Sequence, residues 1–191
     1  MEIDVGVILA GGKSRRMGKD KKFLLKNGET FLEHQYNVLS KIFKNVFVSV
    51  NKRSEKVKFP QIADMVDAGV LGGIYSSLKE LKKPAFFVAV DMPFISEDIV
   101  DRFSSYYNDD IDLIVSEYRG KIEPLFAVYS PSCLRFMEKN LKVKDFRIIN
   151  FFDKVKIKVI PSIRFYDLDN ESKFLKNINN RETYNKFIKE H

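Results

Sequence analysis

A turn rich in glycine and basic residues follows the first apolar segment of the chain. Residues 4–9 read DVGVIL and are apolar after Asp4, and Gly11 and Gly12 follow Ala10. Glycines at a strand end let the backbone turn sharply and bring bare N–H groups against an anion or a flat base. Lysine and arginine beside them can neutralise a triphosphate and a departing pyrophosphate. The seven basic residues between positions 13 and 26 are Lys13, Arg15, Arg16, Lys19, Lys21, Lys22 and Lys26. This composition predicts a triphosphate site in residues 9–22 rather than a merely charged loop.

Two common phosphate motifs do not fit this turn. Gly12-Lys13-Ser14 ends like a P-loop, but a P-loop has a glycine five residues before Gly12, where this chain has Val7. The dinucleotide motif G-x-G-x-x-G also fails, because Gly11 and Gly12 are adjacent and only Gly18 follows. The spacing therefore excludes a P-loop NTPase and an ordinary dinucleotide site.

A single aspartate stands at the end of the most apolar segment. Residues 85–90 read AFFVAV, and Asp91-Met92-Pro93 ends the run. Magnesium in proteins commonly takes one or two carboxylates together with phosphate oxygens and water. The alternative role for Asp91 is that of a turn or cap residue before Pro93. Together with the basic turn, Asp91 is predicted to bind Mg²⁺.

Other residues that could do chemistry are assigned structural roles. Asp167-Leu168-Asp169 has the form of a D-x-D metal motif, but Asn170 and Glu171 follow it, and a polar turn is predicted instead. Cys133 falls within an apolar helical pattern, which predicts a core thiol rather than a nucleophile. No role is assigned to the two histidines.

Composition limits the class of protein. The chain has 191 residues, which suits one domain over residues 1–191, and its net charge of +7 indicates an anionic partner. One cysteine excludes an internal disulfide. No apolar run is long enough for a membrane span and no secretory signal is visible, so we expect a cytoplasmic protein that binds no membrane. The absence of tryptophan and of a basic motif interleaved with aromatic residues counts against a nucleic-acid-binding module.

Strand and helix patterns alternate along the chain. Strands are predicted at residues 4–9, 46–50, 85–90, 111–116 and 123–129, and helices at residues 30–43, 72–81, 131–141 and from residues 96 and 181. Thr30 and Glu33 form a capping box at the start of the first helix. Residues 142–160 have an irregular pattern. This order predicts a mostly parallel α/β sheet with helices on both faces, whose ligands bind beyond the carboxyl ends of the strands.

The basic turn resembles the signature L-A-G-G-x-S-R-R-M-G-x-D-K of the molybdenum cofactor guanylyltransferases. Residues 9–21 read LAGGKSRRMGKDK and match every specified position. The A-G-G form favours the guanylyl branch of the nucleotidyltransferases over the cytidylyl branch, whose turn usually reads A-A-G. Further matches with the family are Asn51 after its strand, Asp64 before the GVLGGI turn, DMPF from Asp91, EPLFA from Glu123 and NIN from Asn177. The chain departs from the family where Val70 replaces a proline, Val90 replaces a frequent cysteine and Asn180-Arg181 replaces Thr-Pro.

The resemblance implies a Rossmann-like, three-layer α/β/α nucleotidyltransferase of the EC 2.7.7 class. Such an enzyme transfers GMP from GTP to the phosphate of the molybdopterin cofactor and releases pyrophosphate, with Mg²⁺ as cofactor. Molybdenum cofactor biosynthesis proteins and apo-molybdoenzymes are the implied protein partners. The resemblance assigns the nucleotide to Leu9, Ala10, Gly11, Gly12, Lys21, Asn51, Asp64 and Asp91, and catalysis to Asp91, Lys21 and Arg16.

Three alternatives stay open. Asp67 lies close enough to Asp64 in the sequence to compete with it for the guanine. The chain could be a cytidylyl- or sugar-nucleotide transferase of the same superfamily. It could also be a nucleotide-binding protein without turnover.

Overall fold

One twisted seven-stranded sheet organises the protein. The computed structural model describes residues 3–11, 23–26 and 28–190. In order across the sheet the strands are β5 (Gln61–Ala63), β4 (Asn45–Val50), β1 (Val5–Leu9), β6 (Ala85–Ala89), β8 (Lys121–Tyr129), β7 (Leu113–Tyr118) and β9 (Ile157–Pro161). All neighbours pair in parallel except β8, which is antiparallel to both β6 and β7. The mostly parallel α/β sheet predicted from the sequence is confirmed.

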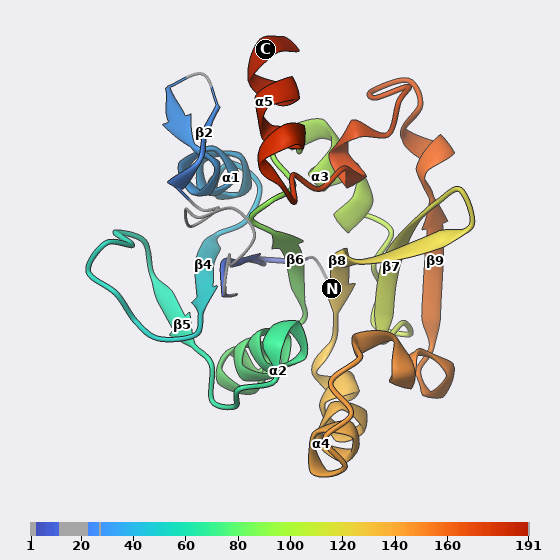
Figure 1. Ribbon diagram of the computed structural model, residues 1–191. Coiled ribbons are helices and arrows are strands. Elements are labelled where there is room, and N and C mark those ends of the chain that lie inside the picture. Colours follow the sequence, from blue (N-terminus) through green and yellow to red (C-terminus); the bar gives the residue numbers. More distant parts are fainter. Residues whose placement is uncertain (1–2, 12–22, 27, 191) are drawn as a thin grey trace.

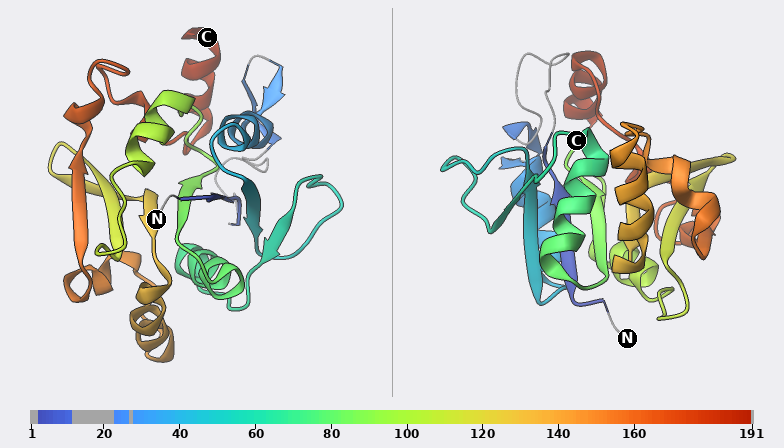
Figure 2. Two further views of the ribbon diagram at one scale, coloured as in Figure 1. Left: turned by 180° about the vertical axis from the view of Figure 1, so that it is seen from behind. Right: turned by 90° about the horizontal axis from the view of Figure 1, so that it is seen from below.

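Helices cover both faces of the sheet (Figure 1). One group comprises α1 (Phe31–Ser40), α3 (Glu97–Ser104) and α5 (Arg181–Glu190), and the other comprises α2 (Gly69–Leu81) and α4 (Leu134–Lys142). Figure 2 shows the two groups from behind and from below. Among the described residues, no helix is long and apolar enough to cross a membrane.

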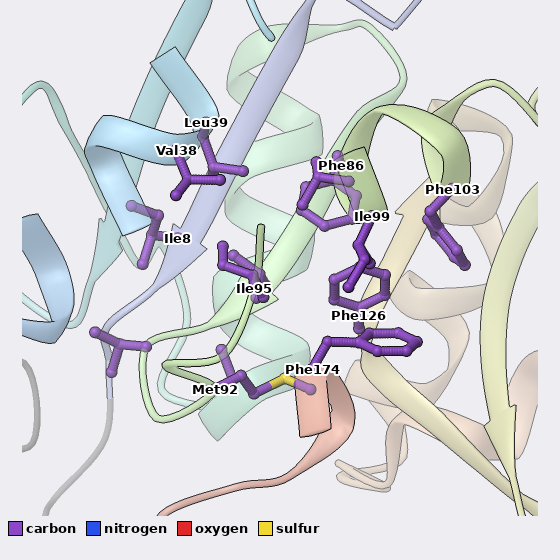
Figure 3. Packing of buried hydrophobic residues seen from close by; sticks show 14 of the residues in the cluster. Ile8, Val38, Leu39, Phe86, Met92, Ile95, Ile99, Phe103, Phe126 and Phe174 are labelled. Atoms are coloured by element: carbon purple, nitrogen blue, oxygen red, sulfur yellow. The ribbon is translucent and has the colours of Figure 1, made fainter. Parts of the chain in front are cut away.

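Alternating strand residues supply two hydrophobic cores, one under each layer of helices. On β6, Phe86 packs in the core with α1 and α3, whereas its neighbour Phe87 packs in the core with α2 and α4. Ile8 of β1 and Phe126 of β8 join Phe86 in the first core (Figure 3). Strands buried on both faces read as continuous apolar runs, which is why β1 and β6 were visible in the sequence.

The order in which the chain adds strands to the sheet reverses between β1 and β6, which makes this the topological switch point. From β1 it moves outward to β4 and β5, and it then returns to place β6 on the other side of β1. In open α/β sheets the crevice beyond the carboxyl ends of the strands at such a point binds the ligand. Gly11 follows β1 and Asp91 follows β6, so the fold brings the two predicted segments to this point.

Several smaller elements differ from the predictions. The hairpin β2 (Leu25–Lys26) and β3 (Glu29–Thr30) and the three-residue β5 were not predicted, because such short strands carry little periodicity. Helix α2 begins at Gly69, three residues before the predicted start. The irregular stretch at residues 142–160 contains the end of α4, a 3₁₀ helix, η3 (Ile148–Lys154), and most of β9. Further 3₁₀ helices in the described part of the chain are η2 (Pro131–Cys133), η4 (Ser162–Phe165) and η5 (Lys173–Leu175).

The predicted capping box is present at the start of α1. The Glu33 amide donates to Thr30 Oγ1 at 3.1 Å, and the Thr30 amide donates to Glu33 Oε2 at 2.9 Å. Replacing Thr30 with alanine should therefore lower the free energy of unfolding by about 1 kcal/mol. Thermal unfolding followed by circular dichroism measures this loss. Ser40→Ala, at the exposed end of the same helix, should change stability by less than about 0.5 kcal/mol.

Candidate active site

A tight turn after β6 carries Asp91 beyond the edge of the sheet. The Met92 amide donates to the Ala89 carbonyl at 3.1 Å, which closes a four-residue turn around Val90 and Asp91. The Val90 amide donates to Leu9 O at 3.1 Å, and the Ile178 amide donates to Asp91 O at 2.8 Å. The turn is thus tied to the end of β1 and to the segment that precedes α5, while the half-buried Asp91 side chain stays partly exposed to solvent.

A second carboxylate, Glu123, lies near enough to Asp91 to feel its charge. The antiparallel pairing of β6 and β8 ends at Val88 and Phe126, and Asp91 and Glu123 each lie three residues beyond this pair. Burial raises the pKa of Glu123, hydrogen bonds from the Leu125 amide and the Asn177 side chain lower it, and the charge of Asp91 raises it. The two carboxylates therefore interact electrostatically across this edge of the sheet.

Gly11, Asn51 and Asp64 meet on the other side of β1. A Cβ atom added to Gly11 would lie 3.0 Å from Asn51 Oδ1 and 3.5 Å from Asp64 Oδ2. A Cβ atom added to Gly73, in the first turns of α2, would lie 2.8 Å from Ser49 Oγ and 3.5 Å from Asp64 Oδ1. Small residues on both sides thus leave the Asp64 carboxylate uncovered, because any larger side chain would press against these groups.

The environment of Asp64 distinguishes it from Asp67. Burial raises the pKa of Asp64 to about 6, a hydrogen bond from Ser49 opposes this shift, and the charge of Asp67 adds to it. Ser49 Oγ lies 3.4 Å from Asp64 Oδ1. Asp67 is exposed. Of the two aspartates that competed in the sequence, Asp64 is the less exposed and lies close to Gly11 and Ser49.

Some of the site residues predicted from the sequence lie together in the structure, and the others fall outside the described residues. Leu9, Ala10 and Gly11 stand at the end of β1, and Asn51, Asp64 and Asp91 surround the same edge of the sheet. Gly12, Arg16 and Lys21 lie outside the described residues. Within the described part of the chain no group of three or more His, Cys, Asp or Glu side chains could hold a metal ion.

Residues that the sequence did not assign to the site also reach it. Glu123 was visible only as part of the EPLFA resemblance, and the pairing of β8 with β6 places it in the same region as Asp91. Gln35, in the middle of α1, donates from its side-chain amide to Ala89 O at 2.8 Å and to Met92 O at 2.9 Å. Nothing in the sequence signals this contact, because the partners are more than 50 residues away.

The structural roles predicted for the other reactive residues are confirmed. Arg102 donates to both Asp167 carboxylate oxygens, at 2.6 and 2.9 Å, and Asp169 accepts from the Phe174 amide at 2.9 Å. Both aspartates thus hold a polar turn. Cys133 is fully buried, and burial raises the pKa of its thiol to about 12, so the thiolate is not formed at neutral pH.

The arrangement is that of a nucleotidyltransferase: a three-layer α/β/α fold with a glycine turn after β1 and a carboxylate after β6 at the switch point. A family model described as the MobA-like NTP transferase domain matches residues 6–153. The chain belongs to this family, and the curated relatives that it matches include molybdenum cofactor guanylyltransferases.

Two relatives illustrate the similarity. A probable molybdenum cofactor guanylyltransferase of Carboxydothermus hydrogenoformans is 32% identical over 185 residues, covering 95% of this chain and 93% of the relative. A molybdenum cofactor guanylyltransferase of Campylobacter jejuni is 33% identical, covering 96% and 95%. These matches confirm the resemblance seen in the basic turn.

Solved structures confirm the fold. Molybdopterin-guanine dinucleotide biosynthesis protein A from Archaeoglobus fulgidus superimposes with a TM-score of 0.85 at 19% identity, covering 96% of each chain. A cytidylyltransferase from Leptospira borgpetersenii superimposes with a TM-score of 0.67 at 18% identity, covering 96% of this chain and 84% of that one. Both likenesses concern the fold alone.

Proposed function

We propose that this protein transfers GMP from GTP to the terminal phosphate of the molybdopterin cofactor and releases pyrophosphate. The observation that carries the proposal is the placement of two different acidic sites at one edge of the sheet. Asp64 lies beside Gly11 on one side of β1, and Asp91, whose charge acts on Glu123, follows β6 on the other. A base site and a phosphate site separated by one strand are what a nucleotidyltransferase requires, and the curated relatives carry the same activity in their names.

Asp64 would recognise guanine through its donor edge. Guanine presents N1–H and the exocyclic amine side by side, and an ionised carboxylate can accept from both. Cytosine, adenine and uracil do not present two adjacent donors of this kind. Asn51, beside Gly11, and the backbone at Leu9, Ala10, Gly11 and Gly12 would line the nucleotide.

Asp91 and Glu123 fit a divalent cation. Both are hard oxygen donors of the type that Mg²⁺ prefers, and one or two carboxylates with phosphate oxygens are a common magnesium ligand set. A cation between them would also offset the repulsion that contributes to the raised pKa of Glu123. Mg²⁺, when bound, would withdraw negative charge from the phosphates of GTP. Arg16 and Lys21 would hold the same phosphates.

The chemistry needs positioning more than proton transfer. The terminal phosphate oxygen of the acceptor attacks the α-phosphorus of GTP in line, a new P–O bond forms, and the bond to the bridging α–β oxygen breaks as pyrophosphate leaves. The attacking oxygen is already anionic, so no general base and no covalent enzyme intermediate are required. The roles of the protein are to align the two phosphates and to neutralise charge.

The partners and the setting follow from the reaction. The substrates would be GTP and the molybdopterin cofactor, and the product would pass to molybdenum cofactor biosynthesis proteins or apo-molybdoenzymes. We place the reaction in the cytoplasm and within a single domain of residues 1–191. Neither nucleic acid nor a membrane takes part in it.

The decisive assay is pyrophosphate release with each of the four triphosphates, with and without the pterin acceptor. We expect release with GTP only when the molybdopterin cofactor is present. Preferential release with CTP would make the protein a cytidylyltransferase. Binding of GTP without any release in the presence of acceptor would make it a nucleotide-binding protein without turnover.

A further inference from the structure

A buried glutamine links helix α1 to the turn that carries Asp91. Gln35 is fully buried, and its side-chain nitrogen donates to Ala89 O at 2.8 Å and Met92 O at 2.9 Å. These two carbonyls belong to the first and last residues of the four-residue turn. One amide group therefore spans the turn, with Asp91 between the two points that it holds.

Two further backbone bonds tie the turn to the sheet and to the chain before α5. Val90 is tied to Leu9 O, and Asp91 O accepts from the Ile178 amide. The Ala89 carbonyl accepts from the Met92 amide as well as from Gln35. The Met92 carbonyl receives a side-chain bond from Gln35, so removal of that amide releases the end of the turn that follows Asp91.

A glutamine at this buried position would lower the stability of the fold if it served packing alone. Its Oε1 is buried and, among the described residues, has no hydrogen-bond partner. A buried polar atom left unpaired is unfavourable, whereas an apolar side chain of the same length would fill the space without that penalty. The two donated bonds are what the amide supplies at this position.

Helix α1 is itself anchored close to Gln35. The Phe31 amide, one turn earlier, donates to Leu24 O at 2.7 Å, and the Phe31 ring packs edge-on against Phe187 of α5 at 5.6 Å. The start of α1 is thus fixed to Leu24 and to α5, and Gln35, one turn further along, joins the same helix to the Asp91 turn.

We propose that Gln35 is a positioning residue for the transfer reaction: it holds the Ala89–Met92 turn so that the Asp91 carboxylate faces the phosphates. The inference rests on the proposed metal-binding role of Asp91. Groups that orient a metal ligand without touching the metal commonly change metal affinity or activity 10- to 100-fold when they are removed. Gln35 should therefore affect turnover and metal affinity far more than affinity for GTP.

The test replaces Gln35 with methionine, which has a similar length but no donor. We expect kcat to fall about 10- to 100-fold with the KM for GTP within about threefold of wild type. Binding of Mn²⁺ in the presence of the α,β-methylene analogue of GTP, followed by electron paramagnetic resonance, should weaken about tenfold. Gln35→Asn keeps the amide on a shorter side chain, and we expect a smaller loss of both kcat and Mn²⁺ affinity. If the methionine variant does not fold, the asparagine variant provides the same two measurements.

Gln61→Met is the matched control. The Gln61 side chain likewise donates to two backbone carbonyls, Ser54 O at 3.0 Å and Val57 O at 2.9 Å, but it holds the loop before β5. It should lose thermal stability to an extent similar to Gln35→Met while keeping kcat and Mn²⁺ affinity. If Gln35→Met and Gln35→Asn also keep both, Gln35 serves stability alone and the inference is wrong. If Asp91→Ala keeps turnover and Mn²⁺ binding, the proposed metal role fails instead, whatever the Gln35 variants do.

Discussion

Replacing Asp91 with alanine is expected to reduce turnover at least about 1,000-fold while the protein stays folded. The turn that carries Asp91 is held by backbone bonds to Leu9 and Ile178 and by the Gln35 amide, and none of these bonds involves the Asp91 carboxylate. Loss of the carboxylate should therefore remove charge from the phosphate site without unfolding the turn. Pyrophosphate release at saturating GTP and acceptor measures the effect, and circular dichroism reports the fold.

Asp98→Ala is the control for this experiment. Asp98 is exposed in the first turn of α3, seven residues beyond Asp91. Its removal should leave both turnover and Mn²⁺ binding close to wild type. Near-normal turnover by Asp91→Ala would show that Asp91 does not bind the metal, and Asp91 would then be a turn residue only.

The sequence predicts the parts of this fold that carry strong local signals. Strands β1 and β6 are buried on both faces and are therefore apolar throughout, and α1 begins at a capping box that needs only Thr30 and Glu33. Strand β5 has only Ile62 buried, so neither alternation nor an apolar run marks it. The antiparallel insertion of β8 between β6 and β7 depends on long-range pairing that no local pattern encodes.

The site was predictable where chemistry follows a strand end. Asp91 and Gly11 come directly after β6 and β1, and parallel strands bring their carboxyl ends to one edge. The sequence alone favours Asp64 over Asp67 only through the family resemblance, and the structure adds that the two aspartates differ in burial. Glu123 was visible only through the EPLFA resemblance and Gln35 not at all, since the pairing of β8 and the position of α1 on the sheet decide what they touch.

Replacing Asp64 with asparagine is expected to change the preferred base from guanine to xanthine. The asparagine carbonyl can still accept from N1–H, but its NH₂ group would face the exocyclic amine of guanine, donor against donor. Xanthine has an oxygen at that position, which the NH₂ group can satisfy. We expect kcat/KM for GTP to fall about 100-fold and XTP to become the better substrate. Steady-state kinetics with GTP, XTP and CTP tests this.

Asp67→Asn is the matched control, with the same substitution three residues away at an exposed position. It should keep the preference for GTP. If Asp67→Asn loses that preference while Asp64→Asn keeps it, Asp67 reads the base and our choice between the two aspartates is wrong.

The same carboxylate should make stability and GTP use depend on pH in opposite directions. Burial raises the pKa of Asp64 from 3.8 to about 6, so ionisation is less favourable in the folded protein than in the unfolded chain. The folded state therefore loses stability as the pH rises from about 4 to about 6, and above that the loss is complete. Because Asp64 is half-exposed, we expect Asp64→Asn to exceed wild type by only about 1 kcal/mol at pH 7.5 and to match it near pH 4.

GTP recognition requires the ionised form, because a protonated carboxyl cannot accept from both guanine donors. For wild type, kcat/KM for GTP should fall about tenfold per pH unit below pH 6, whereas Asp64→Asn should show no such step. Urea unfolding and kinetics across pH 4.5 to 8 measure the two effects on the same proteins. A variant that gains stability at pH 7.5 but retains the pH step would show that another group reads the guanine. If Asp64→Asn removes both the loss of stability and the pH dependence of kcat/KM, the charge of the half-buried Asp64 both destabilises the nucleotide-free protein and selects the base.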